Sequence, residues 1–411
     1  MKQNNRAVGT AYEQIAGRFL EKKGFQILEY NYRCRAGEID LIARDREYLV
    51  FCEVKYRRTK SAGSALEAVD TKKQKRLYRC AQQYVAAHKI PDAAARFDVV
   101  AIEGNEVCHI ENAFEGAKNI KRGVEKMGLG LRYKNEEQIF QEQYTEPPYL
   151  EYPMFRETGI VKHGFSTRIG GVSKGCFSSL NLSFTRGDEE EAVRENFRRI
   201  GSAMGIRCED MVFTHQTHTT NVRVVTEADK GCGIVKPRTY SDVDGLVTDI
   251  PGICLVTFYA DCVPLYFVDP VKKVIGLSHS GWRGTVGKIG KVTVETMCRE
   301  FKSRPEDILA AVGPSICQDC YEVSEDVIRQ FQKNFPEDCW DALFYQKENQ
   351  KYQLNLWKAN ELIFYEAGIL PEHIAVTNLC THCNSEILYS HRQAGDARGN
   401  LCAFLALNQE V

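Results

Sequence analysis

The sequence of 411 residues contains no apolar run of about 18 residues, which is the length a helix needs to cross a bilayer. Its first residues form neither an apolar stretch nor a small-residue cleavage site of the kind that directs export. These absences exclude a transmembrane protein, and we expect a soluble protein of the cytoplasm. Internal repeats and low-complexity tracts are also lacking, and the 43% of hydrophobic residues is close to the average of globular domains.

Histidine is scarce, and the nine histidines include no H-x-H pair. A multicopper oxidase holds its copper cluster with many histidines, which are typically arranged in such pairs. The sequence therefore excludes multicopper oxidase chemistry and makes copper a poor candidate cofactor. A weak or adventitious oxidase activity stays open.

Net charge is also low, at −1, but it is unevenly divided. Residues 1–126 hold 24 Lys and Arg against 17 Asp and Glu, which gives +7. Residues 127–411 hold 30 against 38, which gives −8. The basic excess favours a polyanion as partner of the N-terminal part, although an ordinary solvated face often has a similar excess.

Cysteine, by contrast, is abundant, with 16 residues. In a reducing compartment these are expected to be buried apolar residues, metal ligands or reactive thiols before disulfides. The length predicts about two to three domains. Charged, glycine-bearing sequence at 112–131 and the pair Pro147-Pro148 indicate a boundary. The expected organisation is a domain at 1–118, a linker at 119–147 and a domain at 148–411.

The first domain is predicted to be α/β, in the order helix, strand, strand, helix, strand. Ile15, Phe19 and Leu20 form the apolar stripe of a helix. Two runs rich in β-forming residues, separated by four polar residues, predict a hairpin. The second helix is expected to be capped by Asp70 and to keep its basic residues in solvent. The ranges and residues are strands 38–43, 48–54 and 96–102, buried Leu77, Ala81 and Tyr84, and exposed Lys72, Lys73, Lys75, Arg76 and Arg79.

A candidate nuclease site lies on the predicted hairpin. Glu53 and Lys55 project to the same face of one strand, and Asp40 lies on the other. Two carboxylates could bind Mg²⁺, and a lysine could orient the attacking water, which is the chemistry that phosphodiester cleavage needs. Glu13 on the first helix adds a carboxylate. The alternatives are an ion pair between Glu53 and Lys55, and a capping box of Thr10 with Glu13.

These residues lie within motifs that resemble a small bacterial family of restriction-endonuclease-like proteins related to Holliday junction resolvases. The resemblance covers about residues 7–105. It implies an endonuclease-type fold, a site of Glu13, Asp40, Glu53 and Lys55, and DNA contacts by the helix at 72–79; a non-catalytic DNA-binding protein is the alternative. The motifs are Asn31-Tyr32-Arg33, Gly37-Glu38-Ile39-Asp40-Leu41-Ile42-Ala43, Phe51-Cys52-Glu53-Val54-Lys55-Tyr56-Arg57 and Arg96-Phe97-Asp98-Val99-Val100.

The second domain is also predicted to be mixed α/β, with strands at 252–257 and 273–278 and helices at 285–302 and 323–334. Three residues of this domain are candidate zinc ligands: His218, Cys262 and His279. Two imidazoles and a thiolate suit Zn²⁺, and three protein ligands leave its fourth position for water or substrate. Judged by residue type alone, histidines and cysteines beside apolar strands are more often simply packed.

The motifs around these ligands resemble the laccase-domain, or multicopper polyphenol oxidoreductase, family, which includes the peptidoglycan editing factor and zinc-dependent purine nucleoside phosphorylases. The resemblance spans about 150–407. It implies a mixed α/β fold, zinc bound by His218, Cys262 and His279, and Arg168 and Asn181 as pocket residues. The motifs are Gly164-Phe165-Ser166-Thr167-Arg168, Gly170-Gly171-Val172-Ser173, Ser179-Leu180-Asn181-Leu182, Gln216-x-His218, Ala260-Asp261-Cys262-x-Pro264, His279-x-Gly281-Trp282-Arg283-Gly284, Val312-Gly313-Pro314-Ser315-Ile316 and Tyr321-Glu322-Val323.

Phosphorolysis of purine nucleosides fits these residues best. Residues 278–284 are expected to follow a strand and begin a helix, so that backbone N–H groups and Arg283 bind phosphate. Asp261 would assist departure of the purine. The expected substrates are phosphate and adenosine, inosine or 5′-methylthioadenosine, and the same zinc site could also deaminate adenosine.

Other interpretations stay open. Cys262 as nucleophile with His279 as base would make a cysteine hydrolase acting on a peptidoglycan precursor, and the family's name suggests a polyphenol oxidase. A second, structural zinc site could also form, or the same cysteines could be buried thiols. The oligomeric state is not determined by the sequence. The cysteines of that second site are Cys317, Cys320, Cys380 and Cys383.

Overall fold

The protein folds into two compact units, Met1–Gly128 and Leu129–Val411. The computed structural model describes residues 5–46, 48–57, 71–88, 90, 94–103, 106–111, 113, 129–143 and 145–409. Within these ranges, no helix combines the length and the apolar character that spanning a membrane requires.

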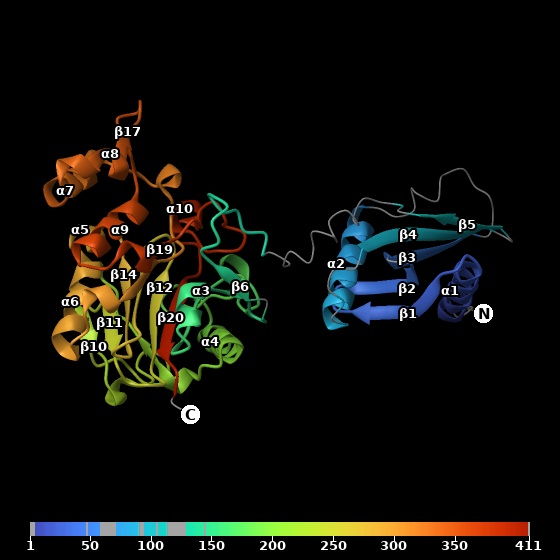
Figure 1. The fold of residues 1–411 in the computed structure, drawn as a ribbon, viewed down its shortest axis with the longest axis horizontal. Coiled ribbons are helices and arrows are strands. Elements are labelled where there is room, and N and C mark those ends of the chain that lie inside the picture. Colours follow the sequence, from blue (N-terminus) through green and yellow to red (C-terminus); the bar gives the residue numbers. More distant parts are fainter. Residues whose placement is uncertain are drawn as a thin grey trace. The chain divides into compact units, whose positions relative to one another are not determined.

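The N-terminal unit is a mixed five-stranded sheet with a helix on each face (Figure 1). The strand order is β1-β2-β3-β4-β5; β3 and β4 are parallel, and the other neighbours are antiparallel. The predicted hairpin is β2–β3. The edge strands β1 and β5 were not predicted from the sequence. The elements are α1 (Asn5–Lys22), β1 (Gln26–Cys34), β2 (Gly37–Asp45), β3 (Tyr48–Arg57), α2 (Thr71–Ala87), β4 (Ala94–Glu103) and β5 (Glu106–Ile110).

Alternation along β3 builds two apolar cores in this unit. Leu49 and Phe51 pack toward α2, with Tyr84, whereas Val50 and Cys52 pack toward α1, with Leu20. The predicted inward residues of α2 are buried, as expected. Asp70, the predicted cap of that helix, and the side chain of Lys72 lie outside the described residues.

The C-terminal unit contains two six-stranded sheets and a small three-stranded sheet. Their strand orders are β10-β11-β14-β13-β15-β19, β6-β7-β8-β20-β12-β9 and β16-β18-β17. The strands are β6 (Gln141–Gln143), β7 (Tyr149–Glu151), β8 (Val161–Ser166), β9 (Met211–Phe213), β10 (Val222–Val224), β11 (Gly245–Thr248), β12 (Cys254–Tyr259), β13 (Val263–Asp269), β14 (Val274–Ser280), β15 (Leu309–Val312), β16 (Glu322–Val323), β17 (Phe344–Gln346), β18 (Tyr352–Leu354), β19 (Ile374–Val376) and β20 (Leu401–Leu407). The helices are α3 (Pro153–Glu157), α4 (Glu190–Met204), α5 (Trp282–Val286), α6 (Ile289–Phe301), α7 (Glu325–Asn334), α8 (Trp340–Leu343), α9 (Leu356–Glu366) and α10 (His391–Ala394).

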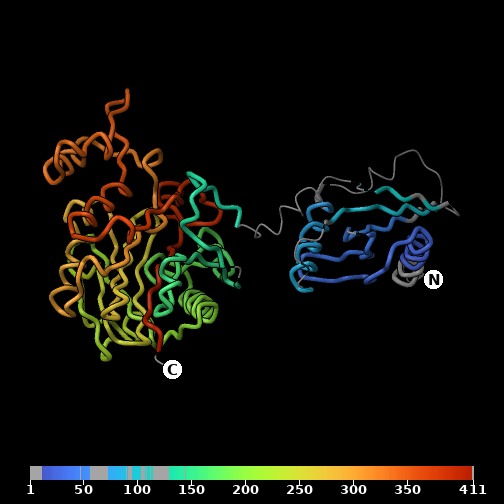
Figure 2. The backbone as a smooth tube through the Cα atoms, viewed as in Figure 1, coloured from blue at the N-terminus to red at the C-terminus, as the bar shows by residue number. Residues whose placement is uncertain are grey.

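The two large sheets stack face to face, with helices on both outer faces (Figure 1). Leu255 of β12 and Tyr266 of β13 belong to the core between the sheets. On the outer faces, Phe197 of α4 covers one sheet, and Phe364 of α9, together with α6, covers the other. The C-terminal strand β20, red in Figure 2, lies inside its sheet between β8 and β12. The result is a four-layer α/β/β/α unit.

Residues 129–147, which the sequence suggested as part of a linker, contact this unit. The backbone N–H of Lys134 donates to Asn378 O at 2.8 Å, and that of Arg132 donates to Asn384 Oδ1 at 2.6 Å. The predicted helix at 285–302 is two helices, α5 and α6. Lys288 between them has a left-handed backbone, with φ of 59°, which interrupts a continuous helix.

Candidate functional site

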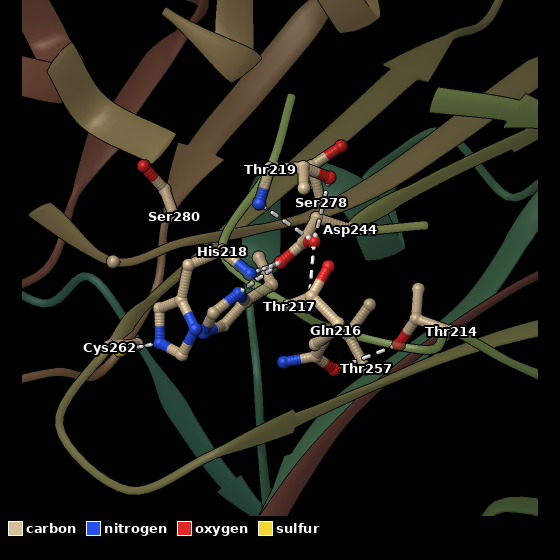
Figure 3. Close-up of polar contacts among 12 residues, drawn as sticks. Thr214, Gln216, Thr217, His218, Thr219, Asp244, Thr257, Cys262, Ser278 and Ser280 are labelled. Carbon is tan, nitrogen blue, oxygen red and sulfur yellow. Dashed lines mark hydrogen bonds and ion pairs between the residues drawn. The ribbon is translucent and has the colours of Figure 1, made fainter. Parts of the chain in front are cut away.

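The three predicted zinc ligands lie together at one end of the stacked sheets. His279 is the second-to-last residue of β14, and Cys262 lies in the turn that precedes β13. Because β13 and β14 pair antiparallel, with Pro264 opposite His279, the turn and the strand end meet. His218 comes from the loop after β9. One donor atom of each residue lies within 4.8 Å of the others, and the Cys262 Sγ to His218 Nε2 distance is 4.0 Å (Figure 3). We refer to these three residues as the His/Cys/His group.

A buried carboxylate that the sequence did not single out, Asp244, organises this group. Its Oδ1 accepts a hydrogen bond from His279 Nδ1 at 2.8 Å, so Nε2 is the ring nitrogen left for a ligand. The backbone N–H groups of Thr217, His218 and Thr219 also donate to Asp244, at 3.0 to 3.1 Å (Figure 3). These bonds hold the His218 backbone in the left-handed region, with φ of 65°.

The electrostatics of the group couple the thiol to the imidazoles. Burial opposes ionisation of Cys262, but the charge of His279 and hydrogen bonds from both histidines outweigh it and lower the pKa of the thiol to about 6. Burial also lowers the pKa of His279, but Cys262 and Asp244 overcome this and raise it to about 9. The metal-free site is therefore a thiolate facing an imidazolium, and a metal ion would take the place of the proton on Nε2.

The residues present fit a zinc ion. Soft sulfur and imidazole nitrogen donors are those Zn²⁺ prefers, and bond lengths of about 2.0–2.3 Å place the donors of one tetrahedral ion roughly 3.3–3.8 Å apart. Gly281 leaves room for this arrangement. A Cβ atom there would lie 2.8 Å from His218 Cδ2 and 3.2 Å from Cys262 Sγ.

The group opens into a cavity of about 360 Å³, a size typical of small-molecule sites. Three arginines, Arg186, Arg238 and Arg398, line it. Arg398 is only 6% exposed, and its Nε has no hydrogen-bond partner among the described residues. Burial and the charge of Arg186 lower the pKa of Arg398 to about 10. Three guanidinium groups around one cavity are typical of an anion site. Other lining residues include Phe184, Phe213, His215, Gln216, Phe258 and Asn400.

The two pocket residues that the resemblance implied, Arg168 and Asn181, are not among the residues that line this cavity. The Arg168 guanidinium donates to the carbonyl oxygens of Ser178 and Ser385. Asn181 is fully buried, and its Oδ1 accepts the N–H groups of Ser183 and Asn400. Since those last two residues do line the cavity, Asn181 shapes its wall from behind.

Asp261 and Arg283 also lie outside the cavity lining. The Asp261 carboxylate accepts hydrogen bonds from Thr381 Oγ1 and from the Arg392 N–H, both at 2.6 Å. Both carboxylate oxygens, Oδ1 and Oδ2, are therefore engaged by residues outside the cavity lining. Arg283 is exposed, and its guanidinium lies over the ring of Trp282 at 4.4 Å. Neither side chain therefore occupies the place that the sequence suggested for it.

The candidate nuclease residues of the N-terminal unit are partly brought together. Leu41 pairs with Cys52, which sets Asp40 and Glu53 next to each other on β2 and β3. Burial and then the charge of Glu53 raise the pKa of Asp40 to about 7. Lys55 Nζ lies 2.8 Å from Glu53 Oε1, and Lys73 of α2 contacts the same oxygen. Lys73 was expected in solvent, but its ammonium instead pairs with this buried carboxylate.

Glu53 Oε2 is buried without a hydrogen-bond partner among the described residues. An orphaned carboxylate oxygen beside a second carboxylate fits a hard divalent cation such as Mg²⁺. Glu13 accepts a hydrogen bond from Asn31, and its charge acts on Asp40. The capping-box alternative for Glu13 is wrong, because α1 begins at Asn5 and Glu13 is beyond its first turn.

Comparison with known proteins identifies the class of each unit. Residues 162–408 match the family model described as multi-copper polyphenol oxidoreductase laccase. The chain belongs to this family. Residues 12–102 match the uncharacterised protein family UPF0102. Both matches confirm the resemblances inferred from the motifs.

Individual relatives are similar to the C-terminal unit. Purine nucleoside phosphorylase YlmD of Bacillus subtilis is 36% identical over 247 residues, which cover 60% of this chain and 88% of that protein. Adenosine deaminase RL5, from an unknown prokaryotic organism, is 35% identical over 234 residues, covering 56% of this chain and 88% of that protein. The crystal structure of YlmD from Geobacillus stearothermophilus matches with a TM-score of 0.61 and 33% identity, covering 66% and 99% of the two chains. This likeness confirms the predicted mixed α/β fold.

Proposed function

We propose that the C-terminal unit is a zinc-dependent purine nucleoside phosphorylase, with adenosine, inosine and 5′-methylthioadenosine as candidate substrates. One observation carries the proposal: the cavity lined by the His/Cys/His group is also lined by three arginines, Arg186, Arg238 and Arg398. A metal site and an anion site thus share a space large enough for a nucleoside. The similarity to purine nucleoside phosphorylase YlmD supports the same reaction class.

In phosphorolysis, a phosphate oxygen bonds to C1′ of the ribose while the C1′–N9 bond breaks. The purine leaves with the bonding electron pair and takes up a proton, and ribose 1-phosphate remains. Arg398 and Arg186 bind the phosphate and orient it. The aromatic side chains of Phe184 and Phe258 offer apolar surface to the purine. When bound, a zinc ion would supply a Lewis acid beside the substrate.

His215 replaces Asp261 as the candidate hydrogen-bond donor to the departing base. It lines the cavity, and its Nδ1 accepts the backbone N–H of Asp242 at 3.1 Å. The neutral ring therefore carries its proton on Nε2, where it can donate. The Asp261 carboxylate is held by Thr381 and Arg392 and acts as a positioning residue beside Cys262.

A second candidate activity is deamination of adenosine, in which water adds at C6 of the purine and ammonia leaves. Its support is the similarity to adenosine deaminase RL5. Purified protein incubated with adenosine separates the two activities. Phosphorolysis yields adenine and ribose 1-phosphate only when phosphate is added, whereas deamination yields inosine without it. If neither set of products forms, both activities are wrong.

The Cys262→Ser variant tests the metal. We expect it to lose the zinc of this site and at least about 100-fold in kcat/KM, whereas Cys176→Ser, at an exposed cysteine, keeps both. A cysteine hydrolase would behave differently. It would be metal-free at this site, and Cys262 would be alkylated rapidly by iodoacetamide.

For the N-terminal unit we propose a Mg²⁺-dependent nuclease site of Asp40, Glu53 and Lys55, supported by the orphaned Glu53 Oε2. Branched DNA incubated with the protein and Mg²⁺ should be cleaved, and Glu53→Gln should abolish cleavage. Binding without cleavage by the wild-type protein would favour the DNA-binding alternative. Charge reversal at Lys75 and Arg76, both exposed on α2, should weaken binding in either case.

A further inference from the structure

Four cysteines form a second cluster of soft ligands, outside the cavity lining. Their Sγ atoms all lie within 4.8 Å of one another, and those of Cys320 and Cys383 are 3.5 Å apart. Zn–S bonds of about 2.3 Å place the sulfurs of a tetrahedral tetrathiolate site roughly 3.8 Å apart. The spacing is therefore that of a site for one ion. The four-cysteine cluster consists of Cys317, Cys320, Cys380 and Cys383.

The fold brings the two C-x-x-C segments side by side, although 60 residues separate Cys320 from Cys380 in the sequence. Ser315 forms a parallel bridge with Cys380, and the Thr381 N–H donates to Ser315 O at 3.1 Å. Cys317 to Cys320 is a tight turn, because the Cys320 N–H donates to Cys317 O at 3.1 Å. Each turn presents two thiols to the same point.

Hydrogen-bond donors and a lysine surround the sulfur atoms of the four-cysteine cluster. The backbone N–H groups of Cys317 and Cys383 both donate to Cys380 Sγ, at 3.3 and 3.5 Å. Lys134, which forms an ion pair with Asp319 at 2.9 Å, also interacts with the thiols of Cys317 and Cys383. Such donors around the sulfur atoms are typical of metal-bound cysteines.

We propose that the four-cysteine cluster binds a structural zinc ion, distinct from the ion of the His/Cys/His group, and that this ion joins the segments 313–321 and 378–384. Four protein ligands leave no position for substrate, so the site is closed. Both segments also form hydrogen bonds with Asp261, the residue next to Cys262. The Ile316 N–H donates to Asp261 O at 3.0 Å, and Thr381 Oγ1 donates to its carboxylate. The structural ion therefore supports the backbone of the cavity-facing site.

Metal content of the full chain, purified under reducing conditions with excess zinc and then desalted, tests the proposal. We expect two zinc ions per chain in the wild-type protein, one in Cys320→Ser/Cys383→Ser, one in Cys262→Ser and none in the triple variant. The matched control Cys176→Ser/Cys339→Ser removes two cysteines elsewhere and should keep two. A double variant that keeps the full zinc content of the wild-type protein would overturn the proposal, and so would a wild-type protein whose single zinc ion is lost in Cys262→Ser.

A conservative variant covers the case in which the double variant does not fold. Cys383→His replaces a thiolate by an imidazole, and Cys₃His is also a common structural set. We expect it to keep two zinc ions. Substitution with Co²⁺ adds a spectroscopic readout, since the intensity of the sulfur-to-cobalt charge-transfer bands should fall in Cys383→His. Retention of the full wild-type band would contradict ligation by Cys383.

Two other occupants would also overturn the proposal. A disulfide between Cys320 and Cys383 would lower the mass of the protein purified under reducing conditions by that of two hydrogen atoms, which mass spectrometry would detect. An iron–sulfur cluster would give a coloured protein with iron and acid-labile sulfide. If zinc joins the segments, amide hydrogen exchange of Ile316 and Thr381 should be faster in the zinc-deficient double variant than in the control.

Discussion

Asp244 shows how much of the metal site depends on a single carboxylate. It sets the tautomer of His279 and also holds the loop that carries His218, through three successive backbone N–H groups. Because the carboxylate is fully buried, these bonds are poorly screened by solvent. Two of the three zinc ligands are therefore placed by a residue that would not touch the metal.

Mutation at the residue scale can test whether Arg398 or Arg283 binds the phosphate. Arg398→Gln should raise the KM for phosphate by about 10- to 100-fold, because a hydrogen bond to a charged group contributes about 1.5–3 kcal/mol. The KM for the nucleoside should change less than about threefold. Arg283→Gln, which removes the exposed arginine that stacks on Trp282, is the matched control and should leave both constants unchanged. If Arg283→Gln instead raised the KM for phosphate and Arg398→Gln did not, the phosphate site would lie at residues 278–284, as the sequence motif suggested.

The raised pKa of Asp40 predicts a pH dependence of stability. Its ordinary value is 3.8, and in the folded unit it is about 7. The folded state therefore binds more protons between these values, and the contribution of Asp40 to stability falls as pH rises from about 4 to 7, by at most ~1.4 kcal/mol per pH unit. Denaturant unfolding without Mg²⁺ should show this slope. It should be reduced in Asp40→Asn but not in Glu38→Gln, an exposed carboxylate of the same strand. Parallel profiles for wild type and Asp40→Asn would contradict the prediction.

At the scale of an element, the short helix α5 must be preceded by a glycine, Gly281. Gly281→Ala would place a Cβ against His218 and Cys262, so we expect zinc affinity to fall by about 10-fold or more with little change in Tm. Gly284→Ala, within α5, is the matched control. Its Cβ would meet atoms no closer than 3.5 Å, and alanine favours a helix by about 0.5–1 kcal/mol. Chelator competition measures the affinity; equal affinities in the two variants would rule out the steric argument.

The antiparallel strand pair β13–β14 positions two of the predicted zinc ligands, Cys262 and His279. Cys262 precedes one strand and His279 nearly ends the other, and the antiparallel register brings them together. β11 is the other neighbour of β14, which places Asp244 beside His279. The neighbouring order of three strands thus assembles the site.

At the scale of the whole molecule, every residue assigned to phosphorolysis lies in the unit Leu129–Val411. A fragment of residues 129–411 should therefore retain kcat/KM within about twofold of the full chain, because its buried core is complete by itself. Phosphorolysis with adenosine, together with Tm, measures this. A fragment that folds with the same Tm but has lost activity would show that the N-terminal unit contributes to the reaction.

Much of the fold could be predicted because the spacing of apolar residues along the chain indicates helices and strands. The alternation of Leu49 to Cys52 predicts a strand, and the helical spacing of Leu77, Ala81 and Tyr84 predicts α2. The edge strands β1 and β5 could not be predicted in the same way. No residue of β1 is fully buried, and the described side chains of β5, Val107, His109 and Ile110, are only partly buried, so neither strand has a clear apolar alternation. The break at Lys288 was also missed, because lysine is an ordinary helix-forming residue.

The sequence by itself determined the kinds of ligand available, two imidazoles and a thiolate in ordered motifs, and the segments that carry them. Only the tertiary structure decided which polar groups share the cavity with them. Arg398 and His215 enter it, while Arg168, Asn181, Asp261 and Arg283 do not line it. The physical reason is that secondary structure follows from neighbours along the chain, whereas a cavity is formed by loops whose meeting depends on the order of strands in two stacked sheets.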